Sequence, residues 1–254
     1  MQLDVAFLPA DLASPETSVC IVIDALRASS SIATVFGRGV ESVAVAGTIE
    51  DARRLHGDLP GSLLCGESGG LPPDGFDFGN SPVEFAAADL RGRTLVLATS
   101  NGTRALAALD TAPVVFVGSL LNRAACTAAA LAAIDAIGSV STMTVVCSGT
   151  EFGTTFSLED TVVAGAFVTW IMTSAAEETH ELTDRATAAA RLWRGYESDP
   201  KQAFLEAKHG RYLAGIGMES DLAACAEIDR YAVAPRLHVT VDGRLLLRGG
   251  VRSL

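Results

Sequence analysis

Short apolar runs recur along the chain, and their pattern is typical of buried β-strands. The runs cover residues 19–23, 42–45, 95–98, 114–117 and 144–146. They are rich in Val, Ile and Leu and do not alternate with polar residues, as expected of strands that are covered on both faces. Ala-rich segments of helical length lie between them, such as residues 123–137 and 161–176. This alternation predicts an α/β protein with a three-layer α/β/α architecture and a mostly parallel central sheet.

The C-terminal pattern predicts a β-hairpin. Residues 237–248 read LHVTVDGRLLLR, in which two apolar segments flank a turn at Asp242 and Gly243. Such a hairpin would make the central sheet mixed. Residues 177–212 are more polar and are predicted to form exposed helices or a lid. Since no Pro- or Ser-rich linker divides the chain, residues 1–254 are predicted to form a single domain.

The composition and net charge argue against some classes of binding partner. The chain has 254 residues, of which 49% are hydrophobic and 19% charged, so it can bury a sizeable core. Its formal charge of −11 argues against nucleic acid as a partner, because phosphate backbones are bound by clustered Lys and Arg. A small anion stays compatible with this charge, since local geometry dominates within a Debye length of about 8 Å.

The cysteines and the apolar segments predict a cytoplasmic protein that does not enter a membrane. Five cysteines, an odd number without a CxxC pair, are typical of reduced thiols rather than of a disulfide framework. The first residues lack the basic region of a signal peptide. The longest apolar run, residues 161–176, is shorter than the roughly 20 residues that span a bilayer.

Small polar residues and arginines follow four of the predicted strands. They are Asp24, Arg27 and Ser29 after the first run, Asn101, Gly102, Thr103 and Arg104 after the third, Ser119, Asn122 and Arg123 after the fourth, and Glu159 and Asp160 after the fifth. Ligands of open α/β sheets bind beyond the carboxyl ends of strands, where helix N-termini and Arg side chains attract anions. These turns therefore predict a crevice for a phosphorylated or similarly anionic small molecule. The alternative for each turn alone is ordinary helix capping.

A loop dense in Gly and Pro supplies a further candidate. Residues 65–85 read CGESGGLPPDGFDFGNSPVEF. Long structured loops are often functional, which makes Glu67 a candidate metal ligand or base. Asn80 and Ser81 are predicted to cap a helix that begins at Pro82. The alternative is an ordered Ω-loop held by Phe76 and Phe78.

Five segments together resemble the signature blocks of the 2-phosphosulfolactate phosphatase family. The blocks are IVIDALRASSSIAT, CGESGGLPPDGFDFGNSPVEF, LATSNGTRAL, VGSLLNRAA and FSLEDTVVAGAFV, and they occur in the family's order over roughly residues 1–170. Weaker similarity extends over residues 210–235. The resemblance implies a Mg²⁺-dependent phosphatase that converts 2-phospho-3-sulfolactate to sulfolactate and phosphate, a reaction of coenzyme M biosynthesis in archaea. It also implies an α/β/α fold unlike that of better-known phosphatases.

Other phosphatase classes lack their signatures in this chain. Haloacid-dehalogenase phosphatases need Asp-x-Asp after the first strand, but Leu26 stands two residues after Asp24. Cysteine phosphatases need Cys-x5-Arg, whereas six residues separate Cys20 from Arg27 and four separate Cys225 from Arg230. The chain has no Walker GxxxxGK[ST] motif, and its four histidines are scattered without metal-ligand spacing.

The remaining residues define the expected site. Mg²⁺ prefers one or two carboxylates, waters and substrate phosphate oxygens, and Asp24, Glu67, Glu159 and Asp160 are the candidate ligands. Asp24, Arg27 and Glu67 are the predicted catalytic residues. The arginines Arg27, Arg104 and Arg123 would bind the substrate's anionic groups, with hydrogen bonds from Ser29, Asn101, Gly102, Thr103, Ser119 and Asn122. The alternatives are a phosphatase or a non-catalytic binding protein for another small phosphorylated hydroxyacid. The oligomeric state stays open, a homodimer included.

Overall fold

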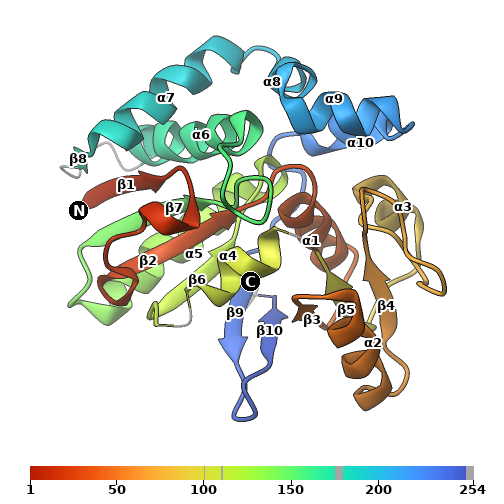
Figure 1. The fold of residues 1–254 in the computed structure, drawn as a ribbon. Helices are drawn as coiled ribbons and strands as arrows, with labels where there is room; N and C mark the ends of the chain where they lie inside the picture. Colours follow the sequence, from red (N-terminus) through yellow and green to blue (C-terminus); the bar gives the residue numbers. More distant parts are fainter. Residues whose placement is uncertain (100, 110, 175–179, 250–254) are drawn as a thin grey trace.

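A mixed β-sheet runs through the protein. The computed structural model describes residues 1–99, 101–109, 111–174 and 180–249, without the side chains of residues 103, 104 and 107. Within these residues ten strands pair in the order β4-β5-β3-β10-β9-β6-β2-β7-β1-β8 (Figure 1). The strands are β1 (Gln2–Ala6), β2 (Ser18–Ile23), β3 (Ser42–Ala46), β4 (Leu63–Gly66), β5 (Thr94–Ala98), β6 (Val114–Val117), β7 (Thr142–Cys147), β8 (Glu181–Leu182), β9 (Arg236–Val239) and β10 (Leu245–Arg248).

The sheet consists of two parallel sets joined by an antiparallel hairpin. Strands β6, β2, β7, β1 and β8 run parallel to one another, and so do β3, β5 and β4. The β9–β10 hairpin lies between the sets and is antiparallel to both of its neighbours. The predicted C-terminal hairpin and mixed sheet are therefore confirmed. All five predicted strands are present, whereas the sequence patterns did not predict β1, β4 or β8.

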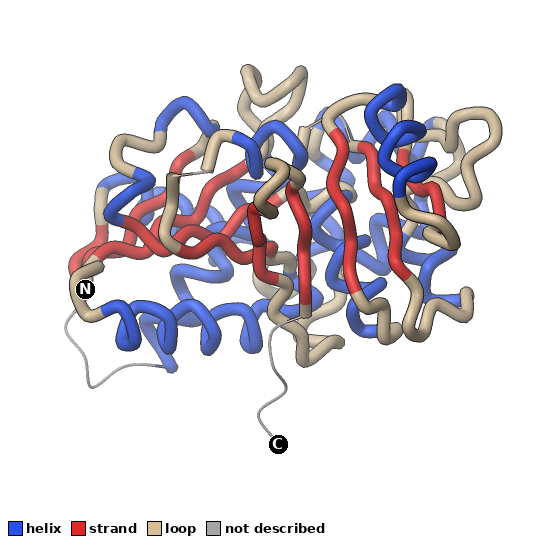
Figure 2. Tube along the Cα trace, turned by 90° about the horizontal axis from the view of Figure 1, so that it is seen from below, coloured by secondary structure: helices blue, strands red, loops and turns tan. Residues whose placement is uncertain are grey.

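Helices cover both faces of this sheet (Figure 2). The α-helices are α1 (Ala28–Gly37), α2 (Ile49–Asp58), α3 (Pro82–Ala87), α4 (Gly102–Ala107), α5 (Arg123–Ile137), α6 (Leu158–Ser174), α7 (Asp184–Tyr196), α8 (Pro200–Glu206), α9 (Lys208–Gly215) and α10 (Glu219–Cys225). Short 3-10 helices form at η1 (Pro9–Asp11), η2 (Pro15–Thr17) and η3 (Leu120–Asn122). The predicted α/β class and the three-layer arrangement are confirmed.

Alternate residues of β2 face two different cores. Val19, Ile21 and Ile23 pack with α5, α6 and α7, whereas Cys20 and Val22 pack with α1 and α4. The second core also contains residues of β3 and β5, which belong to the other parallel set. Both sets of strands therefore contribute to the core around α1 and α4.

The polar segment predicted over residues 177–212 is mostly helical where the structure describes it, apart from the short strand β8 and the turns between the helices. Helices α7, α8 and α9 bury Trp193, Phe204 and Leu213 against the core around α6, and Figure 1 shows these helices along the top of the molecule, with α7 on the side of β1 and β8. The segment thus carries its own apolar face instead of being exposed throughout. Residues 175–179, which include the predicted end of the helix over 161–176, lie outside the described residues.

One described helical stretch is long and apolar enough to cross a membrane. It covers Leu120–Ile137 and spans η3 and α5. The core helices of soluble proteins have the same composition. Cys126, Ala130 and Ile134 of α5 pack against the sheet in the core shared with α6. The prediction that residues 1–254 form one domain stays a prediction.

Candidate active site

A cavity of about 320 Å³ lies where several strands end. Asp24 and Arg27 follow β2, Glu67 follows β4, Asn101 follows β5, and Glu151 follows β7. The start of α9 completes the wall. The full lining consists of Asp24, Leu26, Arg27, Glu67, Gly69, Gly70, Asn80, Thr99, Asn101, Thr150, Glu151, Phe152, Lys208, His209 and Tyr212. The predicted crevice at the strand ends is therefore a real cavity, and it is large enough for a small ligand.

The turn between β2 and α1 fixes Asp24 on the buried side of this cavity. The Ala28 backbone N–H donates to Asp24 Oδ1 at 3.3 Å. The Ser29 hydroxyl donates to the Asp24 carbonyl at 2.8 Å, and the Asp24 backbone N–H contacts the same hydroxyl oxygen at 3.2 Å. Ser29 is fully buried and does not line the cavity, so it holds the turn that carries Asp24. The structure gives Ser29 this positioning contact in place of the predicted substrate contact.

Three other carboxyl groups interact electrostatically with Asp24 or its neighbours: the buried Glu159 and Asp160 and the half-buried Glu67. The pKa of Asp24 is raised to about 7, mainly by burial and also by the charges of Glu67 and Glu159, while the Ala28 and Gly102 backbone N–H groups oppose the shift. Burial also raises the pKa of Glu159. Burial, Glu159 and Asp24 together hold the pKa of Asp160 well above its ordinary value. This cluster of acids lacks a compensating cation among the described residues that shift the pKa of Asp24.

The predicted metal ligands divide into two groups. Asp24 and Glu67 line the cavity, whereas Glu159 and Asp160 are buried outside its lining. Asp160 accepts the Ala25 backbone N–H at 2.8 Å and the Gly149 backbone N–H at 3.1 Å. It therefore ties the turns after β2 and β7 together at the first turn of α6. Asp24 and Glu67 are the pair that can reach a ligand.

This donor set fits a hard divalent cation with few protein ligands. Within the described residues, no three acidic, His or Cys side chains converge on one position. Mg²⁺ does not require three, because it keeps waters and uses one or two carboxylates. Asn80 adds an amide oxygen: it is 3% exposed, lines the cavity, and its Oδ1 has no hydrogen-bond partner among the residues that the structure describes. A buried acceptor without a partner is costly, and a cation or its water would satisfy it.

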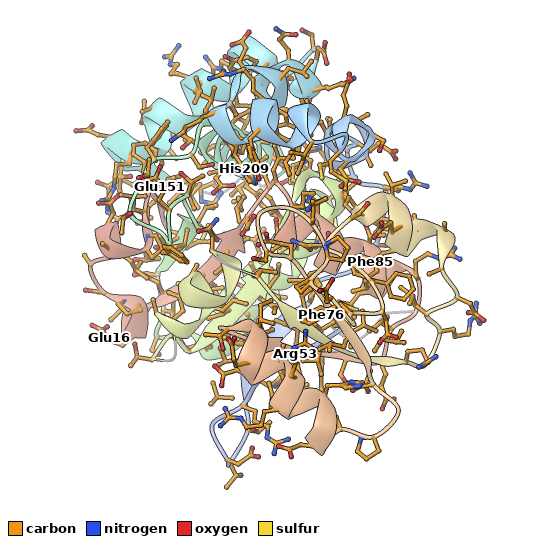
Figure 3. The ribbon with its side chains drawn as sticks, turned by 45° about the vertical axis from the view of Figure 1, so that its right-hand side comes forward. Glu16, Arg53, Phe76, Phe85, Glu151 and His209 are labelled. Atoms are coloured by element: carbon orange, nitrogen blue, oxygen red, sulfur yellow. The ribbon has the colours of Figure 1, made fainter. Side chains whose placement is uncertain are left out.

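The loop of residues 65–85 is both an ordered structure and a wall of the cavity. Gly70 donates its backbone N–H to Glu67 Oε2 at 2.9 Å. Phe78 packs on Phe85 with ring centroids 5.6 Å apart, and the Arg53 guanidinium lies over Phe76, as Figure 3 shows. The predicted helix at Pro82 is confirmed, with Ser81 accepting the Glu84 backbone N–H. The loop is therefore ordered by its Phe side chains and also places Glu67 at the cavity, so the two alternatives do not exclude each other.

Arg27 is fixed by a partner from the distant helix α10. Its Nη1 donates to Asp221 Oδ2 at 2.6 Å, and its Nη2 donates to the Gly70 carbonyl at 2.6 Å. Asp221 is fully buried and also accepts the Ser81 hydroxyl at 2.6 Å. The guanidinium therefore joins β2, the loop of residues 65–85 and α10. Asp221 was not among the predicted site residues, because no motif marks an acid 194 residues away as a partner of Arg27.

Helix α9 supplies cavity residues that the sequence analysis missed. Lys208, His209 and Tyr212 come from its first turns. Figure 3 shows His209 and Glu151 near each other at one end of the molecule. Burial lowers the pKa of His209, and nearby Arg27 lowers it too, while Glu67 and the Leu26 carbonyl act in the opposite direction. The one sequence feature that could have indicated these cavity residues is the polar character of residues 177–212, which were predicted to form exposed helices or a lid.

The residues after β5 lie beside Asp24. A Cβ on Gly102 would lie 3.1 Å from Asp24 Oδ2, so glycine permits this close approach. Asn101 lines the cavity and accepts the Phe152 backbone N–H at 2.9 Å. Both predicted positions are therefore next to the site. The side chains of Thr103 and Arg104 lie outside the described residues.

The residues after β6 are not brought to the cavity. Asn122 accepts the Ser119 backbone N–H and donates to the carbonyls of Val117 and Val233. Arg123 pairs with Asp229 at 2.8 Å and lies over the Trp170 ring. Segment 229–235 bonds along the turn after β6, which explains this difference. The positions of Ser119, Asn122 and Arg123 do not support their predicted contact with substrate.

The thiols are placed as inert core groups, and this yields a prediction. All five cysteines are free and buried, and burial raises the pKa of Cys20 to about 12. A nucleophilic cysteine would instead need a lowered pKa. Replacing Cys20 or Cys147 by alanine is expected to leave turnover within about tenfold of wild type. Phosphate-release assays on variants with unchanged circular dichroism would measure this, and complete inactivation of a folded variant would contradict it.

Known proteins similar to this chain identify its family. A family model described as 2-phosphosulpholactate phosphatase matches residues 7–239. A probable 2-phosphosulfolactate phosphatase of Prochlorococcus marinus (strain MIT 9303) is 35% identical over 239 residues, which cover 92% of this chain and 96% of that protein. Proteins with the same name are 36% identical in Thermosynechococcus vestitus, over 90% of this chain and 91% of the relative, and 33% identical in Carboxydothermus hydrogenoformans, over 97% of each. The chain therefore belongs to the 2-phosphosulfolactate phosphatase family, whose members are phosphoric monoester hydrolases.

Proposed function

We propose that this protein is a Mg²⁺-dependent phosphatase that hydrolyses 2-phospho-3-sulfolactate to 3-sulfolactate and phosphate. The observation that carries the proposal is the arrangement of Asp24, Glu67 and Arg27 around one cavity. Carboxylates that suit Mg²⁺ and a guanidinium that suits a phosphate face the same space. Family membership supports the substrate class, since the relatives are named for this reaction.

Different residues of the cavity would bind the cation and the phosphate. Asp24 and Glu67 would hold the cation, with the orphan Asn80 Oδ1 beside them. When bound, Mg²⁺ neutralises phosphate charge and makes water more acidic. Arg27 would bind a phosphate oxygen, and its contacts with Asp221 and Gly70 fix the plane of its guanidinium beforehand. A preformed donor costs little reorganisation when the phosphate arrives.

A substrate panel tests this proposal. Phosphate release would be measured with 2-phospho-3-sulfolactate, with the same compound lacking the sulfonate, and with other phosphorylated hydroxyacids. The proposal expects the highest kcat/KM for the sulfonated compound. Equal or faster release from another hydroxyacid would identify that compound class as the substrate. Binding without release from any compound would identify a non-catalytic binding protein.

Metal removal gives a separate prediction. Chelation with EDTA followed by desalting is expected to abolish phosphate release, and Mg²⁺ should restore it. The physical reason is that Asp24 is buried, and that the charges of Glu67 and Glu159 also raise its pKa, so the site already disfavours negative charge. A bound substrate phosphate would add further negative charge to this site. Without a cation to neutralise it, that charge would weaken substrate binding. Full turnover by metal-free enzyme would contradict the proposed mechanism.

The proposal extends to the cellular context. The free, buried thiols support a cytoplasmic location, because reduced cysteines persist in that compartment. Release of sulfolactate would serve a coenzyme M type of biosynthesis. Fractionation of the source cells and a sulfolactate assay in a deletion strain would test these two points.

A further inference from the structure

The cavity has its charges arranged by depth. Asp24 and Arg27 are 8% and 4% exposed, so they form the buried side. The Lys208 side chain is 82% exposed and lines the same cavity, so it lies at the open rim. A substrate with its phosphorus at Asp24 and Arg27 would therefore point its most distant group toward Lys208.

The two permanent cations of the described lining have different partners. Arg27 is paired with Asp221 at 2.6 Å, and both side chains are buried. Lys208 Nζ lies 3.0 Å from Glu151 Oε1, and both of those side chains are mostly exposed. An exposed ion pair of this kind is weak, because water screens it. An incoming anion can therefore take Lys208 from Glu151 much more easily than it can take Arg27 from Asp221.

We propose that Lys208 binds the sulfonate of the substrate and that Glu151 holds Lys208 at the rim until the substrate arrives. This inference rests on the proposed function. A sulfonate has three equivalent oxygens in a tetrahedral group, which suit the compact ammonium of lysine, whereas the planar fork of arginine suits bidentate contacts. The sulfonate stays ionised at ordinary pH, so a rim position, where water still solvates it, is less costly for it than burial.

The start of α9 adds to this arrangement. The helix begins at Lys208, and its N-cap, Ala207, has no side chain that could cap the first N–H groups. The positive end of the helix dipole therefore lies at the same rim as the lysine. Gly210 in the same turn is required by close packing, because its Cβ would collide with the Phe204 carbonyl. This close contact with α8 fixes the position of the first turn of α9, and with it the backbone of Lys208.

The test compares sulfonated and non-sulfonated substrates in matched variants. In Lys208→Met, the preference for 2-phospho-3-sulfolactate over 2-phospholactate, taken as a ratio of kcat/KM, is expected to fall about tenfold or more. Lys208→Arg should keep most of this preference, since the charge remains. Lys201→Met is the matched control: Lys201 lies on α8, pairs with Glu219, and is absent from the cavity lining. It should leave the ratio at the wild-type value.

Binding of the product provides a second measurement. Calorimetry with 3-sulfolactate should show an affinity about tenfold weaker in Lys208→Met. Glu151→Gln should bind 3-sulfolactate about two to five times more tightly than wild type, because Lys208 no longer has to leave a partner. An unchanged substrate preference in Lys208→Met, or equal loss for both substrates, would overturn this inference alone. Failure of the wild-type enzyme to release phosphate from the sulfonated substrate would overturn the proposed function, and this inference with it.

Discussion

Asp24→Asn is expected to lower turnover by about a hundredfold or more at saturating Mg²⁺. Asparagine caps helices about as well as aspartate, so a role in capping α1 would leave activity nearly unchanged. It lacks the charge that Mg²⁺ needs, so a role as a metal ligand makes the same change severe. The variant retains an oxygen for the Ala28 backbone N–H, which contacts Asp24 at 3.3 Å. Steady-state phosphate release would give kcat for both proteins.

The stability of this variant separates the two roles further. Because the pKa of Asp24 is raised from its ordinary value of 3.8 to about 7 in the folded protein, ionisation of this carboxyl lowers the stability of the metal-free protein progressively above pH 3.8, and the full cost is present above pH 7. At pH 8 without metal, Asp24→Asn should therefore melt at the wild-type temperature or above it. Glu16→Gln, an exposed acid that Figure 3 places away from Glu151 and His209, is the control for loss of one charge. Near-normal turnover in folded Asp24→Asn would reduce Asp24 to a helix cap.

The serines after Arg27 show what the sequence could and could not predict. Three consecutive serines, Ser29 to Ser31, stand at the start of α1, and Ser29 was predicted to bind the substrate. In the structure their hydroxyls bond backbone oxygens: Ser30 donates to the Ala25 carbonyl and Ser31 to the Asn80 carbonyl. Buried hydroxyls need such partners. The run therefore fixes the turn that presents Asp24 and Arg27, and only its neighbours face the cavity.

Local patterns predicted the strands well because these strands are buried on both faces. Continuous apolar runs identified β2, β5 and β6, and the turn at Asp242 and Gly243 identified the hairpin. The sequence pattern did not predict β8, because this strand has only two residues. It did not predict β4, because β4 ends in a glycine-rich motif. The cavity residues that could be predicted are those that directly follow a strand, such as Asp24 and Asn101. Contacts between distant segments, such as Arg27 with Asp221, have no local signal.

The turn after β6 shows the limit of the strand-end rule. Its sequence resembles the other turns, and the rule alone placed Arg123 at the ligand. The rule assumes that the space beyond each strand is free. Here Tyr231 bonds the Leu121 carbonyl and Asp229 bonds Arg123, so the chain itself fills that space. A segment more than a hundred residues later decides which turns can bind.

Asp221→Ala is expected to destabilise the protein by about 3–5 kcal/mol, because it leaves the Arg27 charge buried without its partner. The Arg27 and Asp221 side chains are 2% and 1% exposed, so water cannot replace the lost contact. The Ser81 hydroxyl, which caps α3, loses its acceptor as well. Urea unfolding at fixed pH would measure the change. Glu219→Ala on the same helix removes an exposed acid and should cost far less.

A double variant separates the structural role of this pair from its role in the reaction. Arg27→Met combined with Asp221→Leu replaces both charges with apolar side chains, and such replacements of buried ion pairs are often neutral or stabilising. The double variant should regain much of the stability lost in Asp221→Ala. It should not regain turnover, because the phosphate would lack the guanidinium. Wild-type turnover in the stable double variant would remove Arg27 from the proposed site, and an unchanged unfolding midpoint in Asp221→Ala would show that Asp221 does not hold it.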